Sequence, residues 1–253
     1  YHGQPGVQHK VAREVADLCV DPKFLPAAGV SDILEVGWGT GYLTRLLAER
    51  FPDAEIMATD VSQSMINSMR KHLRGQDNVL LQAGDIRSLS LSSDYALIVS
   101  SSALHWINPL TPVLQRLMDA LQPGGILVCA LMTRGTLGEL HDLRKQIAPH
   151  KHAKTELPDS RELITSLNKS GYSLDYTAEQ SITIQYPSAL DFLKTINRQG
   201  VTGGFFDSAN KLNRTELKKL IADYEHLYPH PDGGVRATYN VFTLCLTRIL
   251  HEK

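Results

Sequence analysis

Cysteine is scarce in this sequence of 253 residues. Its three cysteines, Cys19, Cys129 and Cys245, lie far apart and show no paired spacing. This argues against a disulfide framework and against a cysteine-ligated zinc, and we expect no metal site. The same usage is typical of a reducing compartment, so we expect the cytoplasm.

Excess charge and long apolar runs are missing as well. The 26 basic residues nearly cancel the 27 acidic ones, so the overall charge offers no reason to expect nucleic acid as a partner. No stretch approaches the roughly 18 to 20 apolar residues that span a bilayer. The first residues carry neither a charged nor an apolar signal region. We therefore expect neither nucleic acid nor a membrane as a partner.

Hydrophobic periodicity predicts an α/β fold. Valines at helical spacing, including Val7, Val11 and Val15, predict a helix over 7–20. Strand and helix patterns then alternate, which predicts a parallel sheet covered by helices on both faces. The predicted strands are 33–36, 55–59, 79–82, 95–100 and 126–131, and the helices are 41–50, 63–74 and 110–121. Pro123, Gly124 and Gly125 are predicted to form the turn before the strand at 126.

The pattern changes beyond residue 132. Helices are predicted at 135–147, 160–169, 188–198 and 213–224, and strands at 180–186 and 237–248. Between the two late strands, residues 187–236 predict a small helical cap over the carboxyl edge of the sheet. We expect residues 1–253 to form a single domain.

A glycine cluster follows the first predicted strand. Gly37, Gly39 and Gly41 allow a tight turn and a close approach of backbone N–H groups to a ligand at the start of the next helix. The G-x-G-x-G spacing is one residue short of the dinucleotide fingerprint, because Tyr42 follows Gly41. Asp60 closes the second strand 19 positions after Gly41, where its carboxylate can accept hydrogen bonds from ribose hydroxyls.

A further acidic residue follows the third strand. Asp85 can accept a hydrogen bond from an adenine amine, and Ile86 can pack against the ring. Glu35 precedes the glycines. Its alternative role is structural: a carboxylate at the end of the strand that accepts hydrogen bonds from the amides of the glycine loop. Together these residues predict an adenosine-binding site.

The motifs that carry a family resemblance are, in chain order, the run EVGWGTG at 35–41, Asp60, Gly84-Asp85 and QPGG at 122–125. In these motifs the sequence resembles class I S-adenosylmethionine-dependent methyltransferases. The resemblance covers the donor-binding half, 30–131. It implies a Rossmann-like, seven-stranded, mostly parallel sheet with an antiparallel last strand, and S-adenosylmethionine as cofactor. The cofactor-binding residues it implies are Glu35, Gly37, Gly39, Gly41, Asp60, Val61, Asp85, Ile86 and Ser101. Trp38 departs from the family, which has a small residue or cysteine there.

Two other classes remain as alternatives. A dinucleotide-dependent oxidoreductase also uses a glycine loop and a strand-end carboxylate. A non-catalytic binding protein could keep the methyltransferase fold without turnover, although the intact glycines, Asp60 and Asp85 count against it.

The segment after the fourth strand, SSALHW at 101–106, bears on the acceptor. Amino methyltransferases of nucleic acids use an Asn/Asp-Pro-Pro-aromatic turn at this place, and no cysteine here follows a proline as in cytosine-C5 enzymes. Methylation of nucleic-acid bases is therefore disfavoured. Leu104-His105-Trp106 is common in small-molecule methyltransferases, where the aromatic ring lines the pocket.

Motifs in the later part resemble the malonyl-acyl carrier protein O-methyltransferase family of biotin synthesis. They are 132–141, Leu157-Pro158, Leu193-Lys194, 200–203, 212–214 and 238–242, with Tyr1, His2 and Gln8 near the start. The resemblance implies methylation of the free carboxylate of a malonyl thioester, borne by acyl carrier protein or coenzyme A. A quinone ring or a free dicarboxylic acid stays open as the acceptor, and no motif sets the oligomeric state.

Esterification of a carboxylate explains why no catalytic base is conspicuous. The acceptor is already anionic at pH 7, so positioning and desolvation suffice, with a cationic or hydroxyl group to orient it. His105, Tyr1 and Arg198 are the catalytic candidates, and the further candidates for this contact are His2, Thr133, Arg134 and Tyr239. Cations in the predicted cap also suggest docking of an acidic carrier protein. They are Lys194, Arg198, Lys211, Arg214, Lys218 and Lys219, opposed by Asp207 and Glu216.

Overall fold

A computed structural model of the chain describes residues 6–26, 29–63, 73, 75–92, 94–151, 156–167, 172–198 and 211–249. The chain divides into two compact units. The first contains Tyr1–Leu131, Pro158–Glu179 and Phe242–Lys253, and the second contains Met132–Leu157 and Gln180–Val241. The second includes the predicted cap region 187–236. The single-domain assignment stays a prediction.

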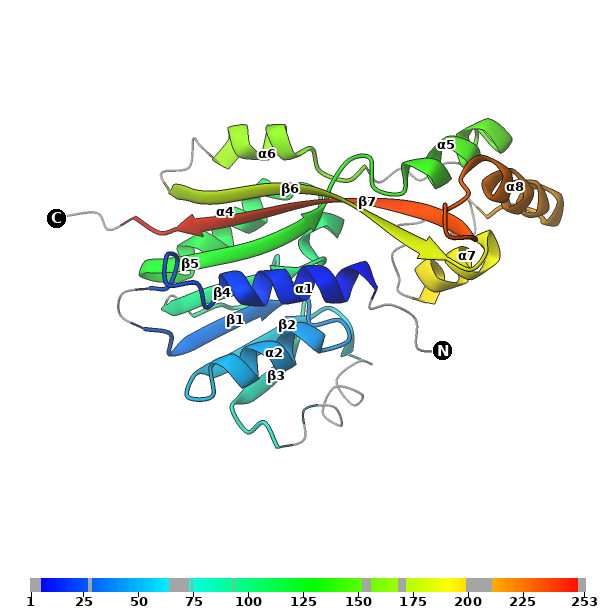
Figure 1. Cartoon of the computed structure of the whole chain (residues 1–253). Coiled ribbons are helices and arrows are strands. Elements are labelled where there is room, and N and C mark those ends of the chain that lie inside the picture. Colours follow the sequence, from blue (N-terminus) through cyan, green and yellow to red (C-terminus); the bar gives the residue numbers. More distant parts are fainter. Residues whose placement is uncertain are drawn as a thin grey trace. The chain divides into compact units, whose positions relative to one another are not determined.

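A seven-stranded sheet is the central element, with strand order β3-β2-β1-β4-β5-β7-β6 (Figure 1). The pairs from β3 to β5 are parallel. The arrow of β7 points opposite to those of its neighbours β5 and β6 (Figure 1). This confirms the predicted fold class. The strands are β1 (Asp32–Val36), β2 (Glu55–Asp60), β3 (Val79–Ala83), β4 (Tyr95–Ser101), β5 (Leu121–Met132), β6 (Ser173–Tyr186) and β7 (Val235–Thr247).

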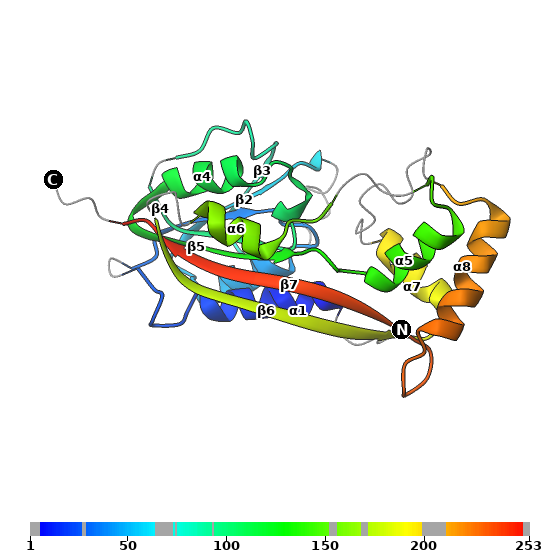
Figure 2. The same ribbon diagram turned by 90° about the horizontal axis from the view of Figure 1, so that it is seen from above.

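In the first unit, helices cover both faces of the sheet (Figure 2). Helices α1 (Val7–Leu18) and α2 (Tyr42–Arg50) pack against each other on one face. Helices α4 (Thr111–Asp119) and α6 (Ser160–Leu167) pack together on the other. A short 3-10 helix, η2 (Leu104–Trp106), follows β4. Most of the predicted helix 63–74 lies outside the described residues.

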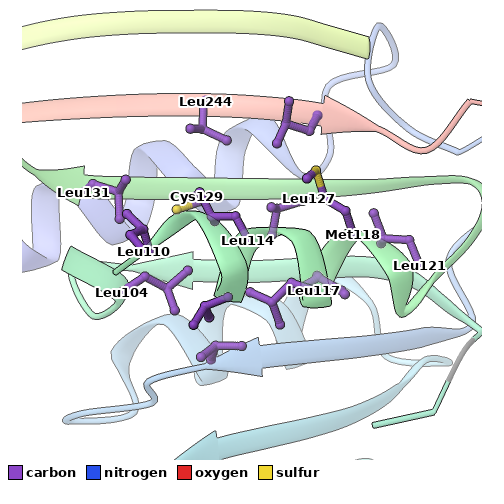
Figure 3. Close-up of a cluster of buried hydrophobic side chains, with 14 of the residues drawn as sticks. Leu104, Leu110, Leu114, Leu117, Met118, Leu121, Leu127, Cys129, Leu131 and Leu244 are labelled. Atoms are coloured by element: carbon purple, nitrogen blue, oxygen red, sulfur yellow. The ribbon is translucent and has the colours of Figure 1, made fainter. Parts of the chain in front are cut away.

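The main core of the first unit lies between α4 and the sheet. Figure 3 shows Leu114 and Leu117 of α4 beside Leu127 and Cys129 of β5. β4 is buried along six of its seven positions, as expected for a central parallel strand without polar alternation. Burial on both faces explains its uninterrupted apolar run.

The second unit contains the helices α5 (Gly138–Ile147), α7 (Ala189–Arg198) and α8 (Arg214–Leu227). Helix α8 packs against both α5 and α7. A capping box starts α8, because the Asn213 side chain accepts from the Glu216 N–H and the Glu216 carboxylate accepts from the Asn213 N–H. Within the part of the chain that the structure describes, no helix is long and apolar enough to cross a membrane.

Two predicted strand starts were wrong by at least five residues, at β5 and β6. β6 begins at Ser173 rather than 180, because its first half alternates half-buried with exposed residues and carries a weak apolar signal. β5 begins at Leu121, and the predicted turn at Pro123, Gly124 and Gly125 lies within it. There the pairing with β4 shifts register between Tyr95 and Leu97, so the extra residues form an irregularity inside the strand.

Candidate active site

The glycine loop leaves the carboxyl end of β1 in left-handed backbone conformations. The φ angles of Gly37, Gly39 and Gly41 are +82°, +51° and +78°. The N–H groups of Gly37 and Trp38 both donate to the carbonyl of Thr59 in β2, at 2.8 and 3.3 Å. This positions the N-terminus of α2, which starts at Tyr42, for contact with a ligand.

The loop also lies close to the segment after β4. A Cβ atom built on Gly37 would lie 2.1 Å from the Cβ of Ala103, whereas one built on Gly39 would meet no described residue within 4 Å. Glycine is therefore required at position 37 by packing inside the protein. At position 39 the space is open, which suits the approach of a ligand to the backbone.

Asp60 lies beside this loop, as predicted. Its Oδ2 accepts from the N–H of Gly39 at 3.1 Å, and its Oδ1 accepts from the N–H of Ser62 at 3.0 Å. Because each carboxylate oxygen can accept more than one hydrogen bond, the carboxylate keeps capacity for two ribose hydroxyls. Val61, the next residue, is 74% exposed and offers an apolar surface at this point.

The adenine candidates follow β3. The Gly84 N–H donates to the carbonyl of Asp60 at 2.8 Å, so the ends of β2 and β3 are joined. Asp85 forms an ion pair with Arg87, whose guanidinium and N–H hold the pKa of the carboxyl at about 2. Asp85 is thus ionised and an adenine amine would share it with Arg87. Ile86 is buried in the main core.

A set of buried polar side chains lies at the ends of β1 and β4 and in α2. Glu35 is fully buried, and both carboxylate oxygens have no hydrogen-bond partner among the described residues. The same holds for the hydroxyls of Thr44, Ser101 and Ser102. Buried polar groups are nearly always hydrogen-bonded in native proteins. Their position around a glycine loop therefore fits a polar ligand.

The structure contradicts the alternative account in which Glu35 accepts from the glycine-loop amides. The amides of Gly37 and Trp38 donate to Thr59, that of Gly39 to Asp60, and that of Gly41 to the Trp38 carbonyl. Burial raises the pKa of Glu35 to about 7, the negative charge of Asp60 adds to the rise, and the nearby Thr44 hydroxyl opposes it. The sequence did not single out Thr44 or Ser102. Thr44 could have been noticed as a polar residue in the first turn after the glycines, but the positive φ of Ser102, +55°, has no signal in the sequence.

Trp38 turns its ring into the protein. It is 3% exposed and belongs to a small hydrophobic cluster with Ala58 and Leu73, against which Val79 and Leu81 pack. The large residue is therefore accommodated beneath β2 and β3. The sequence departs from the methyltransferase pattern at Trp38, and the structure buries the large side chain there.

His105 and Trp106 lie in η2, directly after β4. Burial lowers the pKa of His105 to about 3, so the imidazole is neutral and provides no positive charge at physiological pH. The ring of Trp106 lies 4.7 Å from it, centroid to centroid, and is 37% exposed. His105 can thus contribute hydrogen bonding, and Trp106 an exposed aromatic surface.

Other predicted contacts lie in the second unit or outside the described residues. Arg198 is the last residue of α7 and is exposed. Tyr239 is fully buried, and its hydroxyl is hydrogen-bonded to that of Tyr186 at 2.8 Å, so it belongs to the core of that unit. Tyr1 and His2 lie outside the described residues.

Two late motifs, 132–141 and 238–242, meet in the second unit. The Thr133 N–H and the Thr136 hydroxyl donate to the Asn240 carbonyl, and the Asn240 side chain donates to the Arg134 carbonyl at 3.2 Å. Thr238 donates to the Glu139 carboxylate. These bonds hold the loop that carries the exposed Arg134. Within the described ranges, no group of His, Cys, Asp or Glu is arranged to hold a metal ion.

The chain is similar to known proteins in sequence and in fold. A family of methyltransferase domains matches residues 33–125, which include the glycine loop, Asp60 and Asp85. Among solved structures, the YcgJ protein of Bacillus subtilis superposes with a TM-score of 0.67 at 13% identity, covering 96% of this chain and 100% of that one. Geranyl diphosphate methyltransferase in complex with S-adenosylmethionine gives a TM-score of 0.57 at 13% identity, with 95% and 85% covered. At these identities the structures support the fold.

With its glycine loop, strand-end carboxylates and matching domain family, this chain is an S-adenosylmethionine-dependent methyltransferase. Among its relatives, malonyl-[acyl-carrier protein] O-methyltransferase of Priestia megaterium is 31% identical over 235 residues, covering 85% of this chain and 82% of the relative. The protein of the same name from Acetivibrio thermocellus is 29% identical over 243 residues, covering 91% and 84%. The chain belongs to the malonyl-[acyl-carrier protein] O-methyltransferase family.

Proposed function

We propose that this enzyme transfers a methyl group to the free carboxylate of a malonyl thioester borne by acyl carrier protein, in biotin biosynthesis. The supporting observation is the extent of the similarity. The relatives of that name align over 85% and 91% of the chain, whereas the general methyltransferase family ends at residue 125. The likeness therefore reaches beyond the donor-binding half.

S-adenosylmethionine, when bound, supplies a methyl group on a positively charged sulfur. A carboxylate oxygen of the acceptor forms the new bond to that carbon, and the electron pair of the broken bond returns to sulfur, giving a methyl ester. No proton has to leave the acceptor, because a carboxylate is ionised at pH 7. Because burial lowers the pKa of His105 to about 3, its imidazole is a weak base, which agrees with a reaction that needs no base.

In this proposal, Asp60 binds the ribose hydroxyls, while Asp85 and Ile86 contact the adenine. Gly37, Gly39, Gly41, Glu35, Val61 and Ser101 complete the donor site. Arg198 is the proposed cationic contact of the acceptor carboxylate, and His105 is a neutral hydrogen-bonding contact. Tyr1 is proposed as a hydroxyl contact.

The proposal is tested with labelled S-adenosylmethionine and three acceptors: malonyl-acyl carrier protein, malonyl-coenzyme A and free malonate. We expect label on the carrier protein and a mass increase of one methyl group on its acyl chain. Label on malonyl-coenzyme A alone would show that coenzyme A, and not acyl carrier protein, bears the malonyl group of the substrate. Label on free malonate in preference to both thioesters would refute the thioester proposal.

Exposed cations of α7 and α8 suggest how the carrier docks. Lys194, Arg198, Arg214 and Lys218 are exposed, while Lys219 forms an ion pair with Asp223 at 2.9 Å. We expect the double variant Arg214→Glu/Lys218→Glu to lower kcat/KM for the carrier-bound substrate, and added salt to lower wild-type activity. A small malonyl thioester should be turned over normally.

A control variant separates docking from net charge. Lys23→Glu/Arg161→Glu changes the charge equally at exposed positions of the first unit and should keep full activity. Equal losses on the carrier-bound and the small substrate would instead indicate damage to the pocket or fold.

A further inference from the structure

The most unusual group in the donor site is the carboxyl of Glu35. It is fully buried at the end of β1, and neither oxygen has a hydrogen-bond partner among the described residues. Unpartnered hydroxyls of Thr44, Ser101 and Ser102 share this condition. A buried carboxylate without a partner is strongly disfavoured in its ionised form. Among the described residues, the Thr44 hydroxyl favours a negative charge on Glu35, and burial outweighs it.

The charged side chains described around Glu35 do not compensate for a negative charge on it. Among the described residues, the charged group that acts on Glu35 is Asp60 of β2, which is itself negative. Helix α2 presents the uncharged hydroxyl of Thr44, which lies near enough to the Glu35 carboxyl to lower its pKa but does not meet the geometry of a hydrogen bond. On the helices packed nearby, Lys10, Arg13, Arg45 and Glu49 are exposed, and Glu14 and Arg50 are partly buried. Within the described ranges, none of these side chains supplies a positive charge to Glu35, and a cationic ligand could supply one.

We propose that S-adenosylmethionine binds to this enzyme in exchange for a proton, with Glu35 protonated in the empty site and ionised once a cationic group of the donor lies beside it. The proton leaves to solvent. The donor has two cationic groups that could play this part: an α-ammonium, which the demethylated product keeps, and the sulfonium, which the product lacks.

The sign of the linkage follows from burial. Because burial raises the pKa of Glu35 to about 7, about half of the empty molecules carry the proton at pH 7 and about nine-tenths at pH 6. An adjacent cation favours the carboxylate and lowers its pKa. Donor binding should then release about half a proton at pH 7 and nearly one at pH 6, and affinity should rise about tenfold from pH 5 to 6 before levelling above about pH 7.5.

The test is isothermal titration calorimetry of S-adenosylmethionine into the whole enzyme, without an acceptor, in buffers of different ionisation enthalpy. The dependence of the observed enthalpy on the buffer gives the number of protons released. We expect release from the wild type and none attributable to the protein in Glu35→Gln. Ionisation of the ligand's own amino group is common to both titrations and cancels. Thr44→Val is the matched control, and it should release more than half a proton at pH 7, because Thr44 lowers the pKa of Glu35.

Equal proton release by the wild type and Glu35→Gln would overturn the proposal. If Glu35→Gln does not fold, the wild-type affinity profile decides, and an affinity that stays constant between pH 5.5 and 7.5 would also overturn it. S-adenosylhomocysteine identifies the cation: release with both ligands supports the ammonium, and release with the donor alone supports the sulfonium. Because no acceptor is present, the outcome is independent of the methylated substrate.

Discussion

Replacing Gly37 by alanine should disrupt the donor loop by steric overlap. The new Cβ would lie 2.1 Å from the Cβ of Ala103, whereas carbon atoms need about 3.5 Å. Either the end of β1 or the segment before η2 must move by more than about an ångström. Gly39→Ala is the matched control, since position 39 also has a positive φ but its new Cβ would meet no atom of the described residues within 4 Å.

The comparison isolates the overlap from other effects. Both variants incur the left-handed backbone cost of about 1–2 kcal/mol, and both gain about 0.4–1 kcal/mol from a stiffer unfolded chain. The difference in unfolding free energy should then equal the overpacking cost, about 1–3 kcal/mol. At this chain length that is roughly 2–12 °C in Tm.

Urea unfolding followed by tryptophan fluorescence measures this difference, because the buried Trp38 lies in the loop itself. Ala103→Gly removes the opposing Cβ, so the double variant Gly37→Ala/Ala103→Gly should recover most of the loss, beyond the sum of the single changes. Equal destabilisation by Gly37→Ala and Gly39→Ala, or a double variant without recovery, would refute the steric explanation.

Three further predictions concern ionisation and donor binding. The pKa of Glu35 is raised in the folded protein from 4.5 to about 7, so stability falls as pH rises between those values, and Glu35→Gln should remove up to roughly 3 kcal/mol of that fall. Unfolding at pH 5 and pH 8 measures it, and a variant that keeps the wild-type pH dependence would exclude this origin. Asp60→Ala should weaken S-adenosylmethionine binding by about tenfold to a few thousandfold, because both ribose bonds are lost. Unaltered affinity in calorimetry would remove the ribose assignment. Single-turnover methyl transfer at saturating donor should be flat from about pH 6.5 to 9, because His105, with a pKa of about 3, does not titrate there. A rise with a pKa near 7 would instead indicate an acceptor that must lose a proton.

Much of the geometry of the candidate donor site could be predicted from the sequence, because parallel strands end at one edge of a sheet. The spacing of Gly41 and Asp60 placed both at that edge, and the structure joins Gly39 to Asp60 by a hydrogen bond of 3.1 Å. The apolar run of β4 and the helix periodicities likewise predicted the layers. These features are local, since each depends on residues within one element or on elements that follow one another in the sequence.

Only the tertiary structure decided the environment of particular side chains. Glu35 reads as an ordinary strand-end carboxylate, but burial and the use of the loop amides by Thr59 and Asp60 leave it without a hydrogen-bond partner among the described residues. Tyr239 reads as a possible substrate contact, yet its hydroxyl is paired with Tyr186, 53 residues away in the chain. Burial and hydrogen-bond pairing depend on which distant segments meet, and no periodicity or spacing within a segment contains that information.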